Sequence, residues 1–250
     1  MDAAGAARFL WGIFEMITQK GNKIYRRQDK ELLCIEPWGK NSFRVRATQR
    51  YEFVPEDISA LLPPQECKVK VFEEDDCTVI ENGKIRCEIT PTGKLRFKNQ
   101  DGKLLLEEFE RIRADYRKEY NSALEIVPRT FEPHQNTDNF RLTVRFEPID
   151  GEKLYGMGQY QQKFLDVKGA ELELAHRNSQ ASVPFALSSL GYGFLWNNPA
   201  IGRVSFNKNI TTWEARSTKK LDYWITAGDT PAEIEEAYAD ATGKVPMMPE

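Results

Sequence analysis

The chain has 250 residues, of which 40% are hydrophobic and 29% are charged. These proportions are typical of a globular protein with one large domain or two smaller ones, and they exclude a disordered chain. The 35 Lys and Arg residues are balanced by 38 Asp and Glu residues. Since no basic excess is available to neutralise a phosphate backbone, nucleic acid is not expected as a partner.

Residues 1–23 are expected to form an extension before the folded domain. Their apolar stretch, residues 9–17, is short, contains Glu15 and is followed by no small-residue cleavage site. A membrane helix needs about 20 apolar residues, and a secretory signal needs a cleavage site. We therefore expect neither a membrane segment nor a signal peptide, and we expect the protein in the cytoplasm.

The four cysteines are Cys34, Cys67, Cys77 and Cys87. They form no C-x-x-C pair, and the chain has only 2 histidines, so neither a zinc site nor any other metal or cofactor is expected. Cys77 and Cys87 flank an expected hairpin and could face each other across it. The favoured alternative is that the cysteines are buried free thiols in a reducing compartment.

Residues 24–228 are expected to form one all-β sandwich, with a soft internal boundary near residue 150. Apolar and polar residues alternate along many short segments, and this period of two buries one face of each strand. Asn82-Gly83 and Asp101-Gly102 are signals for tight hairpin turns. Strands are expected at residues 32–35, 42–47, 77–81, 84–90, 94–98, 103–107, 140–146, 183–188, 191–197, 203–206 and 221–226.

Residues 229–250 are expected to form a helix followed by a connector. Thr230 can cap the helix, Pro231 suits its first position, Glu233 completes a capping box, and Gly243 is a natural stop. Two prolines then favour an extended path out of the domain. The expected apolar stripe of the helix consists of Ile234, Ala237, Tyr238 and Ala241.

The segment from Leu154 to Gln180 is rich in polar groups. Its two glycines at residues 155–158 would let the backbone come close to another group, but the absence of a G-x-G-x-x-G motif argues against phosphate binding. Gln159 and the neighbouring glutamines are neutral hydrogen-bonding groups beside Tyr160, a mixture that suits sugars. A polar loop above the sandwich is the alternative interpretation.

The run His176-Arg177-Asn178-Ser179-Gln180 is a dense polar cluster between two apolar segments. It is interpreted equally well as a recognition loop or as a turn at a sheet edge. No G-x-S-x-G elbow accompanies it, and no pair of acids stands in a distinctive motif. The residues by themselves therefore assign no catalytic group.

The C-terminal hundred residues carry a series of motifs in a specific order. Together they resemble glycoside hydrolase family 31, most closely its α-glucosidase-like and α-xylosidase-like members. The likeness is strong over residues 150–250 and looser over residues 24–150. The motifs are Tyr155-Gly-Met-Gly-Gln159, Ala175-His-Arg-Asn178, Val183-Pro-Phe185, Gly191-Tyr-Gly-Phe194, Asp222-Tyr-Trp-Ile225, and the closing Gly228-Asp-Thr-Pro231 and Thr242–Pro249.

The resemblance implies a galactose-mutarotase-like β-super-sandwich whose one C-terminal helix leads toward a (β/α)8 barrel outside these residues. It also implies a retaining mechanism with two barrel aspartates, so that no residue here is catalytic. A sugar-binding Asn-Arg-Asp segment of the family matches residues 176–178. Arg177 aligns on the family arginine, whereas Asn178 stands where aspartate is usual. His176 belongs to the same segment, and Gln159 and Gln180 are weaker candidates for the pocket rim.

The first hypothesis is accordingly the non-catalytic N-terminal part of an α-glycosidase, inactive on its own. Its substrate would be an α-linked glucose- or xylose-containing saccharide. The domain would pack on the barrel through an apolar face, which also favours self-association into a homo-oligomer. The alternative is a stand-alone carbohydrate-binding module. A mutarotase-like epimerase is disfavoured, because the 2 histidines are scattered and aldose mutarotation needs a positioned acid and base.

Overall fold

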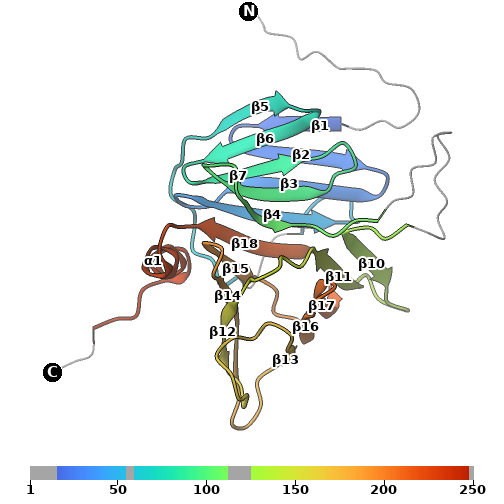
Figure 1. Ribbon diagram of the computed structural model, residues 1–250. Helices are drawn as coiled ribbons and strands as arrows, with labels where there is room; N and C mark the ends of the chain where they lie inside the picture. The colour runs from blue at the N-terminus through green and yellow to red at the C-terminus, as the bar shows by residue number, and fades with distance from the viewer. Residues whose placement is uncertain (1–15, 55–58, 112–124, 248–250) are drawn as a thin grey trace, which may run out of the picture.

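The computed structural model describes residues 16–54, 59–111 and 125–247. Within these residues, 18 strands form three antiparallel sheets, and a single helix follows the last strand (Figure 1). The expected all-β sandwich is thus confirmed. Among the described residues, no helix has the length and hydropathy that a membrane crossing requires.

The largest sheet joins the two ends of the described chain. Its central pair is β4 with β18, in which Ser42 lies opposite Thr226. Because the sheet contains strands from before and after residue 150, the expected soft boundary does not divide it. In spatial order the strands are β1 (Met16–Lys20), β2 (Lys23–Gln28), β3 (Glu31–Pro37), β4 (Ser42–Thr48), β18 (Leu221–Ala227), β15 (Tyr192–Trp196), β14 (Ala181–Ser188) and β12 (Leu154–Gln159).

Two five-stranded sheets lie against the large one, and Figure 1 shows β5–β7 laid across β1–β4. A bridge between Glu108 and Phe146 connects the two smaller sheets. The first consists, in spatial order, of β5 (Lys70–Glu74), β6 (Cys77–Asn82), β7 (Ile85–Ile89), β8 (Leu95–Asn99) and β9 (Leu104–Glu107). The second consists of β10 (Arg129–Pro133), β11 (Phe140–Phe146), β17 (Thr211–Thr218), β16 (Gly202–Phe206) and β13 (Glu171–Leu174).

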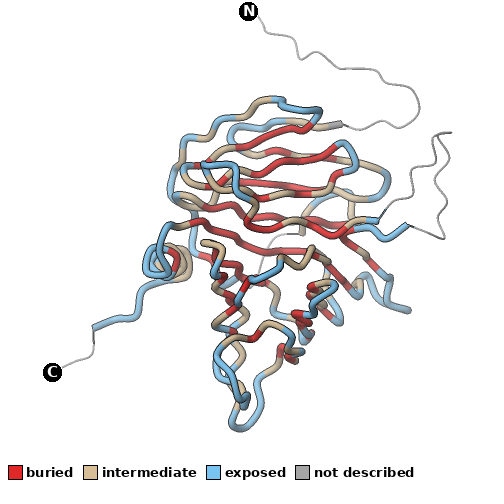
Figure 2. Tube along the Cα trace, viewed as in Figure 1, coloured by how far each residue is buried: buried red, intermediate tan, exposed pale blue. Residues whose placement is uncertain are grey.

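One continuous apolar core fills the space between the three sheets, and Figure 2 shows the buried residues along the facing strands. Tyr223 of the large sheet stands near its centre. Its ring contacts Phe97 of the first small sheet at a centroid distance of 6.4 Å and Phe146 of the second at 6.0 Å. Burying each such ring stabilises the fold by about 1.5–3 kcal/mol. The three sheets therefore share one core.

Helix α1 (Pro231–Thr242) covers the outer face of the large sheet. Ile234 is buried there beside Trp224, and Tyr238 stacks on Phe185 at a centroid distance of 4.1 Å. The helix and its apolar stripe are thus confirmed. The cap differs in one detail from a capping box: Thr230 Oγ1 accepts from the Glu233 amide at 3.2 Å, whereas the Glu233 carboxylate accepts from the amide of Asp229.

Part of the expected N-terminal extension is a strand. Met16–Lys20 forms β1 and pairs with β2 across a tight turn in which Gly21 has a φ of 60°. The segment escaped sequence analysis because an edge strand buries little. Residues 1–15, with most of the apolar stretch, and residues 248–250 of the connector lie outside the described residues.

All four cysteines are free thiols, and Cys34, Cys77 and Cys87 are buried. The alternative in which Cys77 faces Cys87 is wrong, since Cys87 lies opposite Ile80 in the hairpin register. The strands turn at Asn82 and Ile85, so residues must be equidistant from that turn to be paired, and these cysteines are not. Burial raises the pKa of the Cys34 thiol to about 11.

Candidate functional site

The predicted sugar-facing residues lie on a tight turn between β13 and β14. Arg177 and Gln180 close it with two backbone hydrogen bonds, whose N–O distances are 3.3 Å and 3.0 Å. Ser179 has a φ of 69°, in the left-handed region that allows so sharp a reversal. His176, Arg177 and Asn178 are exposed on this turn. Figure 1 shows β12 and β13 in the lower part of the view, away from β1–β4.

Gln159 reaches the same region from β12. It pairs with Ala181, the residue that follows Gln180. The structure therefore brings all five predicted residues to one end of the β12–β14 pair. The segment is therefore a turn at a sheet edge with exposed side chains, and a recognition loop stays a prediction.

The two glycines before Gln159 serve strand packing. A Cβ atom on Gly158 would stand 2.3 Å from the Ala181 carbonyl oxygen, and one on Gly156 would stand 2.6 Å from that of Phe185. Both glycines also have positive φ, at a register shift in the β12–β14 ladder. The close backbone approach that the sequence predicts is therefore an approach to β14.

A glutamate that sequence analysis did not select holds the arginine of the turn. Glu173, on β13, forms an ion pair with Arg177 through one carboxylate oxygen and with Arg216 of β17 through the other, at 3.2 Å. The Arg177 side chain remains 60% exposed. The separation of four residues between Glu173 and Arg177 is only a weak sequence signal for this ion pair, because such pairs are common on protein surfaces.

Tyr160 and His176 tie the turn to the strand ends. The Tyr160 hydroxyl donates to the Glu173 carbonyl oxygen at 2.8 Å and lies 2.8 Å from Ser182 Oγ. The Ser182 amide in turn donates to Nδ1 of His176 at 3.3 Å.

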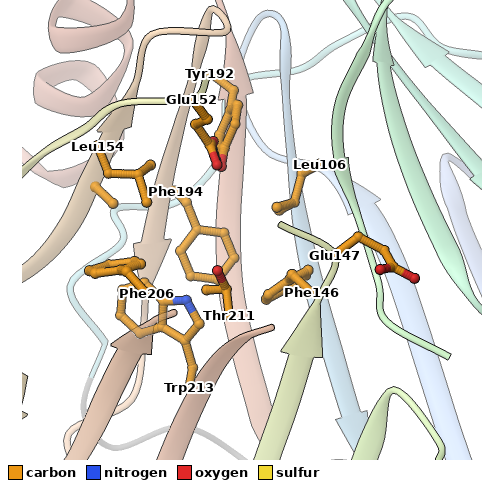
Figure 3. Close-up of a pocket in the computed structure, with 11 residues that line it drawn as sticks. Leu106, Phe146, Glu147, Glu152, Leu154, Tyr192, Phe194, Phe206, Thr211 and Trp213 are labelled. Carbon is orange, nitrogen blue, oxygen red and sulfur yellow. Dashed lines mark hydrogen bonds between the residues drawn. The ribbon is translucent and has the colours of Figure 1, made fainter. Parts of the chain in front are cut away.

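A small cavity between the sheets is separate from this turn (Figure 3). Its volume of about 20 Å³ is space for about one water molecule, whereas pockets for small molecules measure roughly 300–1,000 Å³. Glu152 at its edge accepts hydrogen bonds from Ser188 and Tyr192 at 2.7 Å each and pairs with Lys168. Burial and this carboxylate raise the pKa of Tyr192. The cavity is therefore too small for a sugar, and the buried carboxylate at its edge has hydrogen-bonding partners within the core.

The turn offers chemistry suited to binding. The Arg177 guanidinium only donates hydrogen bonds, whereas the amides of Asn178, Gln159 and Gln180 both donate and accept. Together they match the hydroxyl groups of a neutral polyol. Within the described ranges, no three His, Cys, Asp or Glu side chains gather as a metal site.

Comparisons with known proteins give the family context. The Glycosyl hydrolase 31 N-terminal galactose mutarotase-like domain matches residues 32–204. A protein of Pseudescherichia vulneris called an uncharacterized family 31 glucosidase is 50% identical over 242 residues, which cover 94% of this chain and 45% of that protein. An α-xylosidase of Saccharolobus solfataricus is 30% identical over 125 residues, covering 46% of this chain and 17% of that protein.

Among solved structures, a GH31 α-xylosidase from a soil metagenome, complexed with xylose, has 53% sequence identity and a TM-score of 0.88. The match covers 94% of this chain and 35% of that one. The chain thus spans less than half the length of these relatives. The family model matches most of the sandwich, and the fold matches that of the solved family 31 enzyme. The chain therefore belongs to glycoside hydrolase family 31, and its sheets form the N-terminal galactose mutarotase-like domain of that family.

Proposed function

We propose that this domain is the non-catalytic N-terminal part of a retaining α-glycosidase that hydrolyses α-xylosides or α-glucosides. The observation that carries the proposal is the exposed turn at Arg177, which presents several hydrogen-bonding groups and whose sequence resembles the family's sugar-binding segment. The names of the relatives support the substrate class, since two are an α-xylosidase and a family 31 glucosidase. The two carboxylates that a retaining enzyme needs would come from a barrel outside these residues.

Within this function, Arg177 donates to sugar hydroxyls and Asn178 adds both a donor and an acceptor. An aspartate at position 178, as is usual in the family, would only accept. The amide therefore favours a sugar hydroxyl that accepts a hydrogen bond at that point. His176, Gln159 and Gln180 form the rim around these two residues.

The domain would pack on the barrel through the end of α1. At this end the Leu62 amide donates a hydrogen bond to the Ala241 carbonyl oxygen, and the Leu62 side chain is exposed. Val245 and Met247 follow, exposed by 90% and 95%. Exposed apolar groups of this kind mark interaction surfaces. A homo-oligomer formed through the same surface would be detected by light scattering of the isolated chain.

The decisive experiment compares the isolated chain with a chimera. In the chimera, this domain replaces the matching N-terminal part of the soil-metagenome α-xylosidase. Isolated 1–250 should not hydrolyse aryl α-xylosides or α-glucosides, whereas the chimera should. In the chimera, Arg177→Ala should raise KM roughly 10-fold, which corresponds to the loss of about 1.4 kcal/mol of binding. Turnover by the isolated chain would contradict the proposal.

The exposed turn also favours a second candidate, a stand-alone carbohydrate-binding module. Calorimetry of the isolated chain with xylose and maltose oligomers separates the two. Millimolar or tighter binding that Arg177→Ala abolishes would establish the module. Binding seen only in the chimera would support the glycosidase part.

We also propose a cytoplasmic location. Free thiols are typical of reducing compartments, and the four cysteines are all free. Fractionation of the source cells, followed by thiol labelling of the denatured protein, would test this. Recovery in an oxidising compartment would contradict it.

A further inference from the structure

We infer that Glu173 is a positioning residue for Arg177, and that Tyr160 holds Glu173 in place. The inference rests on the proposed function, because it concerns the arginine assigned there to the sugar. Three features support it: Arg177 and Arg216 share the Glu173 carboxylate, strand β13 holds the Glu173 backbone, and the Tyr160 hydroxyl connects β13 to β14.

The carboxylate of Glu173 lies between two guanidinium groups. One oxygen faces Arg177 and the other faces Arg216, whose Nη2 is 3.2 Å away. The backbone of Arg216 is fixed, since its amide donates to the Ile201 carbonyl oxygen, whereas its side chain is 68% exposed. Its own carbonyl oxygen is bonded to Nε2 of His134. Arg177 is thereby linked through Glu173 to a strand two places away in the sheet.

The backbone at Glu173 is held from both sides. In the β13–β16 ladder, Glu173 lies opposite Arg203. On its other side the Tyr160 hydroxyl donates to its carbonyl oxygen and reaches Ser182 Oγ on β14. Tyr160 therefore spans the gap between β13 and β14 at the base of the turn. Because the backbone of Glu173 is held in place, its carboxylate can restrict the position of the Arg177 side chain.

Removing this carboxylate has two consequences. Arg177 and Arg216 would lose their shared counter-ion, and the two positive groups would repel each other. An arginine side chain also has many rotamers, and an unpaired one samples them freely. Exposed ion pairs contribute little to overall stability. The effect therefore falls on the conformation of Arg177 and on the affinity for sugar.

The first test uses the isolated chain and the NMR signal of the Arg177 side-chain Nε–Hε group. In the wild type the signal should be sharp and slow to exchange with solvent. Glu173→Gln should broaden it and speed exchange at least severalfold, Glu173→Asp should restore part of the order, and Tyr160→Phe should have an intermediate effect. Glu171→Gln is the matched control, because Glu171 lies on the same strand and pairs with Arg203. An unchanged Arg177 signal in Glu173→Gln would overturn the inference.

The second test measures kinetics in the chimera with the soil-metagenome α-xylosidase. Glu173→Gln should raise KM roughly 3- to 10-fold with kcat within about twofold, the size expected for one imperfectly placed hydrogen-bonding group. Glu171→Gln should leave both constants unchanged. If Arg177→Ala raises KM and Glu173→Gln does not, the inference fails while the proposed function stands. If Arg177→Ala has no effect on KM, the proposed sugar contact fails, and the NMR result alone decides whether Glu173 positions the arginine.

Discussion

Arg129 and Arg177 both pair with glutamates, but their surroundings are opposite. The Arg129 side chain, on β10, is 4% exposed, whereas that of Arg177 is 60% exposed. Arg129 donates to Glu31 at 2.8 Å and 3.0 Å, to the Gly93 carbonyl oxygen at 2.9 Å, and to Glu108. Arg177 pairs with a single carboxylate, that of Glu173, which also pairs with Arg216.

The difference in exposure indicates how much each ion pair contributes to the stability of the fold. Glu31 belongs to the large sheet, Glu108 follows β9, and Arg129 itself is on β10, so one guanidinium connects all three sheets. Burial raises the pKa of Glu108, although Arg129 opposes this. A buried charge that loses its partner has neither a counter-ion nor water to solvate it, so the folded state is destabilised. An exposed charge is solvated by water, so the Arg177 pair adds little to stability, which is compatible with the proposed role in binding a ligand.

The largest effect is expected from breaking the buried pair. Arg129→Met should destabilise the domain by about 3–5 kcal/mol, because Glu108 and Glu31 lose their counter-ion in the interior. Urea unfolding followed by tryptophan fluorescence measures the loss. The double variant Arg129→Met/Glu108→Leu should recover part of it, since the unpaired charge is then gone. A loss below about 1 kcal/mol in the single variant would mean that burial does not distinguish the two arginines.

An intermediate effect is expected at Glu107, whose side chain is 18% exposed. Burial alone would raise its pKa, but Lys94 and Arg96 outweigh this and hold it below the ordinary value. A carboxylate with a lowered folded pKa contributes stability above its unfolded pKa of about 4.3, and this contribution is lost as the pH falls through the folded value. Glu107→Gln should therefore cost roughly 0.5–1 kcal/mol at pH 7 and less on acidification. Urea midpoints from pH 7 to pH 3 give the comparison; a cost independent of pH would contradict it.

The smallest effect on stability is expected at the turn. Arg177→Ala should change the free energy of unfolding by less than about 0.5 kcal/mol, as is usual for an exposed ion pair. The same urea titration applies, with Arg203→Ala as a control on another exposed pair. A loss as large as that of Arg129→Met would show that the turn is part of the structural framework.

Local chemistry was enough to predict several elements. The meander from β6 to β9 follows from alternating apolar residues and from the glycines of two of its turns, since Gly83 and Gly102 have positive φ values of 60° and 80°. Helix α1 begins after Thr230 and ends before Gly243 as its caps predict. Strand β12 was missed because its two glycines interrupt the period of two. Strand β13 was missed because it has only four residues, although Leu172 and Leu174 alternate with glutamates.

By itself, the sequence determined the all-β class, the hairpins, the helix and the family motifs, from which a sugar-facing segment at residues 176–178 is predicted. Only the tertiary structure decided that β4 pairs with β18, that Arg129 joins three sheets, and that Glu173 and Arg216, 43 residues apart, meet at Arg177. The physical reason is that turns and caps depend on neighbours in the chain. Pairing between distant strands depends on which faces can be buried together, and that is settled only when the whole core assembles.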